Sequence, residues 1–269
     1  MTSKCYNYPV KGSDFMLLAI DIGNTNIAMG GFEGDKLMFV ARIATDTTKT
    51  PDEYASKIRS VLNMHMSDFQ AIDGAIISSV VPPLNSVMKE AIAFAFHVEA
   101  LLVGPGVKTG INIHCDNPSS VGADLICACV AAHHIYGSPS LVVDMGTATK
   151  MMVVDKTGTF IGVSIIPGVN IALKALASGT AQLPQISLEA PKSVIGKNTV
   201  DCMRSGVVFG NASMIDGMID RFNKEMGEEL KVYATGGLAS SIIGYCNHEI
   251  TLDKDLVLKG LNIIYNKNH

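Results

Sequence analysis

The chain has 269 residues, of which 48% are hydrophobic and 17% are charged, and its formal net charge is −4. This balance supports a large buried core and excludes a disordered or fibrous chain, and the length allows two domains. Because the charge is slightly negative and Lys and Arg are nowhere clustered, nucleic acid is excluded as a main partner.

No apolar run approaches the roughly 20 residues of a membrane span, and the N-terminal segment lacks the apolar core of a secretion signal. The cysteines form no C-x-x-C pair, which is typical of reduced thiols that pack as small apolar side chains. We therefore expect a cytoplasmic protein with no membrane partner.

The first predicted strand starts at Met16, after a polar segment, residues 1–15, that we expect to be an N-terminal extension. The apolar run that follows ends at Asp21, as a buried strand does when it reaches a polar loop. Two short apolar segments come next, separated by a glycine-containing turn at Gly34. This pattern predicts a three-stranded meander.

The same pattern returns at Asp144, 123 residues after Asp21, where a second apolar strand ends in D-x-G and hydroxyl residues. A second meander follows, with its turn at Gly158. The interval is too long for a solenoid repeat and fits a duplicated domain. We therefore expect an α/β protein of two related lobes, the first formed by residues 16–135 and 250–269 and the second by residues 136–249.

Helical and strand patterns alternate in the remaining segments, which makes both lobes mixed α/β. The spacing of apolar residues predicts helices at residues 51–64, 83–96, 169–178, 199–225 and 256–266, and buried strands at residues 73–80 and 231–235.

The two D-x-G segments are candidate phosphate-binding loops. Gly23 after Asp21 allows a tight turn whose N–H groups can approach phosphate oxygens, while the carboxylate can hold hydrated magnesium. One such segment alone is equally compatible with an Asx turn at a strand end. The second copy at Asp144 lets two loops grip a polyphosphate from opposite sides of a cleft.

A third glycine motif, Gly236-Gly237, follows a predicted strand and fits a loop on the adenosine side of a nucleotide, although two glycines are also common in simple turns. The other nucleotide signatures are missing. The sequence has no G-x-x-x-x-G-K-[ST] and no G-x-G-x-x-G that opens a helix, which excludes a P-loop protein and a Rossmann dehydrogenase.

Asp124 lies at a predicted helix start, with Ser119 or Ser120 as the expected N-cap. Its carboxylate either complements the helix dipole or accepts a proton from a substrate hydroxyl. Cys129 and His133 have the spacing of a metal-ligating pair, but no second pair completes a site, so we expect ordinary packing residues.

Seven segments together, in this order, make the chain resemble type III pantothenate kinases from about residue 16 to the C-terminus. They are residues 21–26, 104–110, 117–124, 144–149, 180–184, 195–199 and 234–239. The resemblance implies a duplicated RNase-H-like fold, as in actin and sugar kinases. It also implies a homodimer that phosphorylates pantothenate to 4′-phosphopantothenate, the first step of coenzyme A biosynthesis, with ATP, magnesium and a monovalent cation, potassium or ammonium.

The resemblance also implies roles for single residues. Asp124 would be the proton acceptor, Asp144 would bind the monovalent cation, and Asp21 the magnesium of the nucleotide. The expected nucleotide contacts are Asp21, Ile22, Gly23, Asn24, Thr25, Asn26, Ile27, Ala28, Thr147, Gly236 and Gly237. The expected acceptor contacts are Lys108, Gly110, Cys115, Gly122, Ala123, Leu125 and Thr180.

Three residues depart from the pattern of the family on the expected acceptor side: Leu125 stands for the usual Arg, Cys115 for a Tyr and Lys150 for a Thr. Lys150 either restores a positive charge to the pocket or is an exposed strand lysine. Two alternatives therefore stay open, a kinase of the same fold with another small hydroxylated acceptor, and a nucleotide-binding regulator without catalysis.

Overall fold

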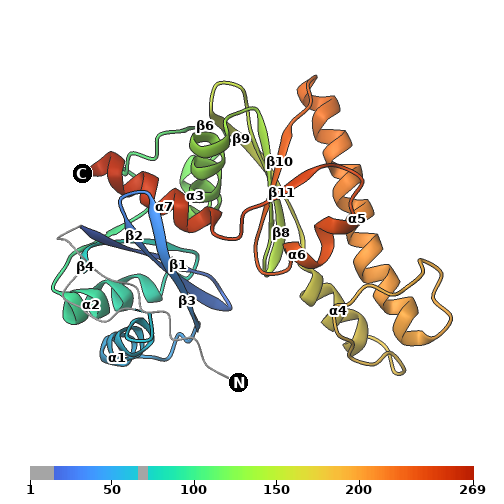
Figure 1. Cartoon of the computed structure of the whole chain (residues 1–269), viewed down its shortest axis with the longest axis horizontal. Helices are drawn as coiled ribbons and strands as arrows, with labels where there is room; N and C mark the ends of the chain where they lie inside the picture. Colours follow the sequence, from blue (N-terminus) through green and yellow to red (C-terminus); the bar gives the residue numbers. More distant parts are fainter. Residues whose placement is uncertain (1–14, 66–71) are drawn as a thin grey trace, which may run out of the picture.

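The computed structural model describes residues 15–65 and 72–269. Figure 1 shows two sheets with helices on both faces of each sheet and two helices, α3 and α7, in the space between the sheets. The expected N-terminal extension lies outside the described residues, apart from Phe15.

The first sheet has the strand order β3-β2-β1-β4-β5 in the described residues. Its antiparallel meander is followed by two parallel strands. Its strands are β1 (Met16–Ile22), β2 (Asn26–Glu33), β3 (Lys36–Ala44), β4 (Ile72–Ser79) and β5 (Ala100–Leu102). The helices α1 (Pro51–Leu62) and α2 (Leu84–Phe96) cover its outer face.

The second sheet repeats this order as β9-β8-β7-β10-β11, with β6 added beside β9. Again three antiparallel strands are followed by two parallel ones. Its strands are β6 (Asn112–Ile113), β7 (Ser140–Met145), β8 (Ala148–Val154), β9 (Thr159–Pro167), β10 (Lys231–Thr235) and β11 (Ile250–Leu252). The shared order confirms the predicted duplication.

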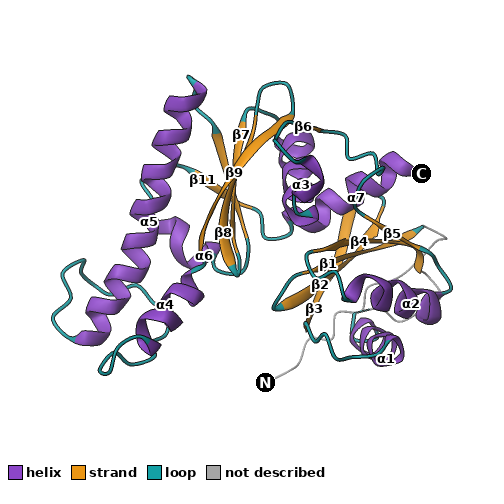
Figure 2. Cartoon of the chain, turned by 180° about the vertical axis from the view of Figure 1, so that it is seen from behind, coloured by secondary structure: helices purple, strands orange, loops and turns teal. Residues whose placement is uncertain are grey.

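The other helices fall into two groups. α3 (Ala123–Ala131), which continues into a π-helical turn (Ala132–Tyr136), and α7 (Leu256–Asn268) pack against each other between the sheets. α4 (Val169–Ser178), α5 (Thr199–Met226) and α6 (Ala239–Ile242) lie on the far side of the second sheet (Figure 2). Short 3₁₀ turns occur at Pro118–Ser120 and Ile243–Tyr245.

Three apolar cores follow from these layers. One joins the first sheet to α1 and α2, and another joins the second sheet to α5 and α6. The central core includes buried residues of both sheets, such as Ala19 and Val142, together with α3 and α7. Because α3 touches both sheets through this core, its N-terminus is held at a fixed place between the lobes.

Local sequence signals explain several helix ends. Thr50 and Glu53 form a reciprocal capping box at the start of α1, and the N-cap Asn198 accepts a bond from Asp201 N at the start of α5. Gly227, with φ +69°, ends α5 in the left-handed region that glycine adopts easily. All five predicted helices and both additional predicted strands are present, with ends within a few residues of those expected.

The assignment of strands to lobes needs one adjustment. Residues 250–252, expected with the first lobe, form β11 in the second sheet, and residues 112–113 add β6 to that sheet. The pairing of β11 with β10 follows from the repeated strand order. The lobe boundaries stay a prediction.

In the part of the chain that the structure describes, no helix is both long and apolar enough to pass through a membrane.

Candidate active site

The two D-x-G loops meet at the mouth between the sheets. β1 and β7 are equivalent strands of the two sheets, and each carries its aspartate, Asp21 or Asp144, at its C-terminal end. The hydroxyls of Thr25 and Thr147, one from each loop, are 3.2 Å apart although 122 residues separate them in the chain. The predicted opposition of the two loops is therefore present in the fold.

The first loop is a tight turn held from outside. Gly23 N donates to Asn26 O at 3.0 Å, and Thr45, just after β3, bonds the loop twice, through its hydroxyl to Gly23 O and its N–H to Thr25 O. Asn24, Thr25 and Asn26 are exposed. Ile22 and Ile27 are fully buried, so these two expected nucleotide contacts offer no exposed surface. Ala28 is half-buried.

The second loop is braced by the glycine pair. Gly146 N donates to Ala148 O at 3.1 Å, two residues on, and Leu238 N donates to Met145 O at 3.2 Å. Gly236 has φ +92°, and a Cβ there would lie 2.7 Å from Asp144 Oδ1. Only glycine therefore fits this contact, which joins the third motif to the second loop.

Four charged side chains gather behind the loops. Asp124 comes from the first turn of α3, Asp21 and Asp144 from the ends of β1 and β7, and Lys150 from β8. Lys150 Nζ lies 2.7 Å from Asp124 Oδ2 and 2.7 Å from Asp144 Oδ2. All three of these side chains are at most 17% exposed, so water screens the pairs only weakly.

The surroundings shift the pKa values in this cluster. Burial, reinforced by the carboxylates of Asp124 and Asp144, raises the pKa of Asp21 from 3.8 to about 7. Burial also raises the pKa of Asp144, although Lys150 opposes the shift. Burial works against the charge of Lys150, but the two carboxylates outweigh it and raise its pKa. The cluster thus holds excess negative charge.

The start of α3 differs from the expected one. Its N-cap is Gly122 and not Ser119 or Ser120, which form a 3₁₀ turn and hydrogen-bond to Asn117. Pro118 favours that separate turn, so the serines lie too early to cap α3. Asp124 remains in the first helical turn, where its Oδ1 accepts a bond from Leu125 N at 2.9 Å.

Comparison with known proteins decides the family. The family model described as type III pantothenate kinase matches residues 17–221. The chain belongs to the type III pantothenate kinase family. A type III pantothenate kinase from Halalkalibacterium halodurans is 44% identical over 254 residues, which cover 94% of this chain and all of that relative. The chain is therefore a member of a family of kinases.

Solved structures share the fold at low identity. The activator of 2-hydroxyisocaproyl-CoA dehydratase from Clostridium difficile, solved with bound ADPNP, has a TM-score of 0.56 at 12% identity, covering 94% of this chain and 95% of the other. An inorganic polyphosphate/ATP-glucomannokinase from an Arthrobacter strain has a TM-score of 0.50 at 15% identity, covering 95% and 100%. These likenesses support the expected two-lobe ATPase fold of the family.

The acceptor contacts expected from the family do not all gather around Asp124. Gly122 and Ala123 adjoin it in α3, and Cys115 is half-buried in the segment before α3. Leu125, however, is only 7% exposed and packs in the central core. Thr180 is exposed beyond the end of α4, where its hydroxyl bonds to Leu176 O.

Lys108 and Gly110 lie at the opposite end of the helical segment that starts with Asp124. A Cβ at Gly110 would be 3.0 Å from His134 Nε2, and His134 is ten residues after Asp124. That separation corresponds to about 15 Å along a helix. Lys108 N donates to Asn268 Oδ1 at the end of α7. Within one chain these two residues are therefore remote from the acidic cluster.

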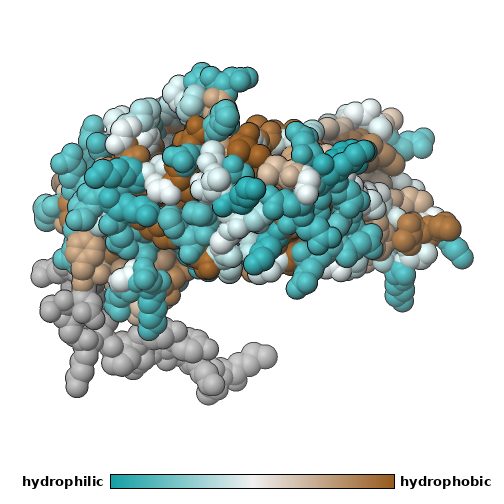
Figure 3. Space-filling model, turned by 90° about the horizontal axis from the view of Figure 1, so that it is seen from above, coloured by the Kyte–Doolittle hydropathy of each residue, from teal (hydrophilic) through white to brown (hydrophobic). Residues whose placement is uncertain are grey.

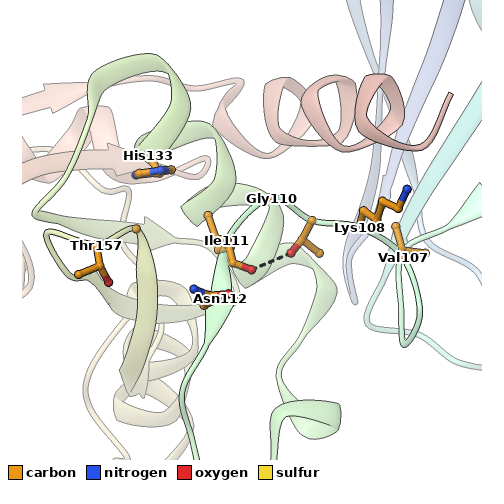
Figure 4. Close-up of a pocket in the computed structure, with 9 residues that line it drawn as sticks. Val107, Lys108, Gly110, Ile111, Asn112, His133 and Thr157 are labelled. Carbon is orange, nitrogen blue, oxygen red and sulfur yellow. Dashed lines mark hydrogen bonds between the residues drawn. The ribbon is translucent and has the colours of Figure 1, made fainter.

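Lys108 and Gly110 instead line a separate pocket of about 390 Å³, drawn in Figure 4. The Thr109 hydroxyl donates to Ile111 O inside this segment, and His133 and Thr157 stand across from it. His133 itself bonds to Ser138 Oγ and lies against Gly158.

Cys129 is fully buried in the central core, as expected for a packing residue.

The sequence left open whether Lys150 is an exposed strand lysine or brings a positive charge to the site, and the structure places it in the acidic cluster. Lys150 pairs directly with Asp144 across β7 and β8, and residues opposite each other in neighbouring strands point to the same face. The sequence signal for this position of Lys150 was the aspartate at the matching position of the preceding strand.

No group of three or more His, Cys, Asp or Glu suited to a metal occurs among the described residues.

Proposed function

We propose that this chain transfers the γ-phosphoryl group of ATP to the hydroxyl of pantothenate, giving 4′-phosphopantothenate in the first step of coenzyme A biosynthesis. The contact between Thr25 and Thr147 carries the proposal, because it closes the two phosphate loops around one site with Asp124 beside it. Family membership supports the same reaction.

The residues divide the work between positioning and proton transfer. The backbone N–H groups of the Gly23 and Gly146 turns, with the exposed hydroxyls of Thr25 and Thr147, hold the phosphates, and Gly237 lies exposed where the adenosine side is expected. Asp124 accepts the proton of the acceptor hydroxyl as the new O–P bond forms. The bond from the γ-phosphorus to the bridging oxygen breaks, and ADP leaves.

Magnesium fits this arrangement. Mg²⁺ in kinases is usually held by one or two carboxylates together with the phosphates of the nucleotide. Asp21 offers a half-buried carboxylate whose charge is opposed by Asp124 and Asp144, so a cation beside it relieves that repulsion. When bound, magnesium neutralises charge on the phosphate oxygens that develops during transfer. Asp21 is the residue that would hold it.

The monovalent cation expected at Asp144 does not fit in the same way. Oδ2 of Asp144 already accepts from the Lys150 ammonium at 2.7 Å, and a second positive charge at that oxygen would face an ammonium. We therefore assign potassium or ammonium no step in the reaction of this chain.

We infer a homodimer in the cytoplasm from the family and from the surface. Several large apolar side chains of β9, α4 and the segment before α5 are exposed and available to a second copy. They are Ile165, Ile171, Leu176, Val194 and Ile195. Figure 3 shows hydrophobic residues at the surface of the end that carries α4 and α5 in Figure 1.

A second candidate is a kinase with another small hydroxylated acceptor. The buried Leu125 supports it, because a core leucine gives the acceptor no charged contact where the family usually has an arginine. A regulator that binds ATP without turnover is a further alternative, favoured by the Lys150–Asp124 pair that occupies the expected proton acceptor.

Coupled ADP release separates these possibilities. The enzyme is incubated with magnesium and ATP, with pantothenate, with other small hydroxy acids and sugars, or with no acceptor. Pantothenate-dependent release is the expected result. Release with another acceptor alone supports the second candidate, and ATP binding without release under any condition supports the regulator.

A further inference from the structure

The ammonium of Lys150 occupies the place between the two carboxylates that face each other across the lobes. Its Nζ is 2.7 Å from Oδ2 of both Asp124 and Asp144, and the lysine is only 17% exposed. Asp124 belongs to α3 and Asp144 to β7, so a single cation joins the helix between the lobes to the second sheet.

This position is fixed by the fold. Lys150 and Asp144 are direct partners in the antiparallel pair of β7 and β8, so the lysine rises on the same face as the aspartate. Asp124 is held by the bond from Leu125 N and by the packing of α3 in the central core. The three charged ends are therefore brought together by rigid elements and not by a loop.

We propose that Lys150 is a built-in replacement for a monovalent cation, so that nucleotide binding and turnover in this chain do not depend on potassium or ammonium. The inference rests on the proposed function. A free cation at Asp144 would have to share Oδ2 with an ammonium at hydrogen-bond distance, and like charges so close repel strongly where water is scarce. Unlike a free cation, the ammonium cannot be diluted away, because it is covalently part of β8.

The alternative role of Lys150, a simple structural ion pair, predicts something different. A structural pair would affect folding but would leave the response to salts unchanged when it is removed. The chain contains a matched example: Lys259 Nζ lies 2.7 Å from Asp253 Oδ2, with Asp253 5% exposed, and α7 carries this lysine outside the loops. Lys259→Thr therefore serves as the control.

The test measures binding of magnesium–ADPNP by calorimetry without any acceptor. Wild type, Lys150→Thr, Lys150→Arg and Lys259→Thr are compared in potassium, ammonium or tetramethylammonium chloride at one ionic strength. We expect the wild-type dissociation constant to change less than twofold between the salts. We expect Lys150→Thr to bind about tenfold more weakly in tetramethylammonium than in potassium, and the other two variants to behave like wild type.

A thermal-unfolding series with the same salts gives a second readout. Lys150→Thr should gain stability from potassium relative to tetramethylammonium, because a cation now binds the folded state, while wild type should not. A wild type whose affinity falls tenfold without potassium overturns the inference. A folded Lys150→Thr whose nucleotide affinity and stability are the same in all three salts also overturns it. If the wild type binds no magnesium–ADPNP in any of the salts, the proposed function is refuted instead.

Discussion

Replacing Asp21 by asparagine should stabilise the nucleotide-free protein at neutral pH and weaken magnesium–ATP binding. Burial and two neighbouring carboxylates raise the pKa of Asp21 from 3.8 to about 7. The folded state therefore resists the ionisation of a group that ionises freely in the unfolded chain. Asparagine has nearly the same shape and no charge to desolvate, so it removes this penalty and also the ligand for magnesium.

The sign and size follow from the shift. Between pH 3.8 and about 7 the folded state binds more protons than the unfolded state, so stability is lost as the pH rises through this window. At about 1.4 kcal/mol per pKa unit, the penalty is about 1.6 kcal/mol at pH 5 and about 4 kcal/mol at pH 8. The gain from Asp21→Asn should therefore grow by about 2.5 kcal/mol between these pH values.

Thermal unfolding of wild type and variant at pH 5 and pH 8, without nucleotide, measures this gain. In a chain of this size each kcal/mol moves the midpoint by about 2 to 4 °C, so the gain should grow by roughly 5 to 10 °C. Asp155→Asn is the control of opposite sign: although burial opposes it, hydrogen bonds from Thr157 and Thr159 lower the pKa of Asp155. An Asp21→Asn gain that is equal at both pH values would refute the reasoning.

Four further predictions address the proposed proton acceptor, the glycine contact, the core and a helix cap. Asp124→Asn should lower kcat about 10²- to 10⁴-fold with magnesium–ADPNP affinity kept, which steady-state kinetics and calorimetry measure together. Gly236→Ala should weaken nucleotide binding at least tenfold, because its Cβ would strike Met145 and Asp144; calorimetry checks it. Leu125→Arg should cost about 3 kcal/mol or more in urea unfolding, since it buries a guanidinium in the core. Thr50→Ala should cost about 1 kcal/mol in the same assay through loss of the capping box.

The longer helices and strands could be predicted because each leaves a local pattern of apolar residues in the sequence. α5 was expected at residues 199–225 and spans Thr199–Met226, and β10 was expected and found at residues 231–235. The strands β5, β6 and β11 were missed because two or three residues leave no periodicity to detect. They exist only through pairing with β4, β9 and β10, which is a property of the assembled sheets.

The candidate site was predictable where a motif recurs and not where packing decides. The duplication of D-x-G was enough to predict that the two loops face one another, and the structure adds the contact between Thr25 and Thr147. Nothing local showed that Leu125 turns into the core while its neighbour Asp124 faces the cluster. Nor did spacing show that Lys108 lies beside the end of α7, since that contact joins residues 160 positions apart.

Two of the departures from the family pattern change the local charge, Leu125 by losing a positive charge and Lys150 by adding one. They do not compensate for one another in space. Leu125 removes a cation from α3 and fills the central core, whereas Lys150 adds one on β8 behind the phosphate loops. A positive charge beside Asp124 and Asp144 offsets the mutual repulsion of the carboxylates, and the Lys150 ammonium is 2.7 Å from the carboxylate proposed to accept the proton of the acceptor hydroxyl. The exchange therefore changes how the cluster is neutralised, and an effect of Lys150 on the acceptor is expected at the hydroxyl beside Asp124 and not at the position of Leu125.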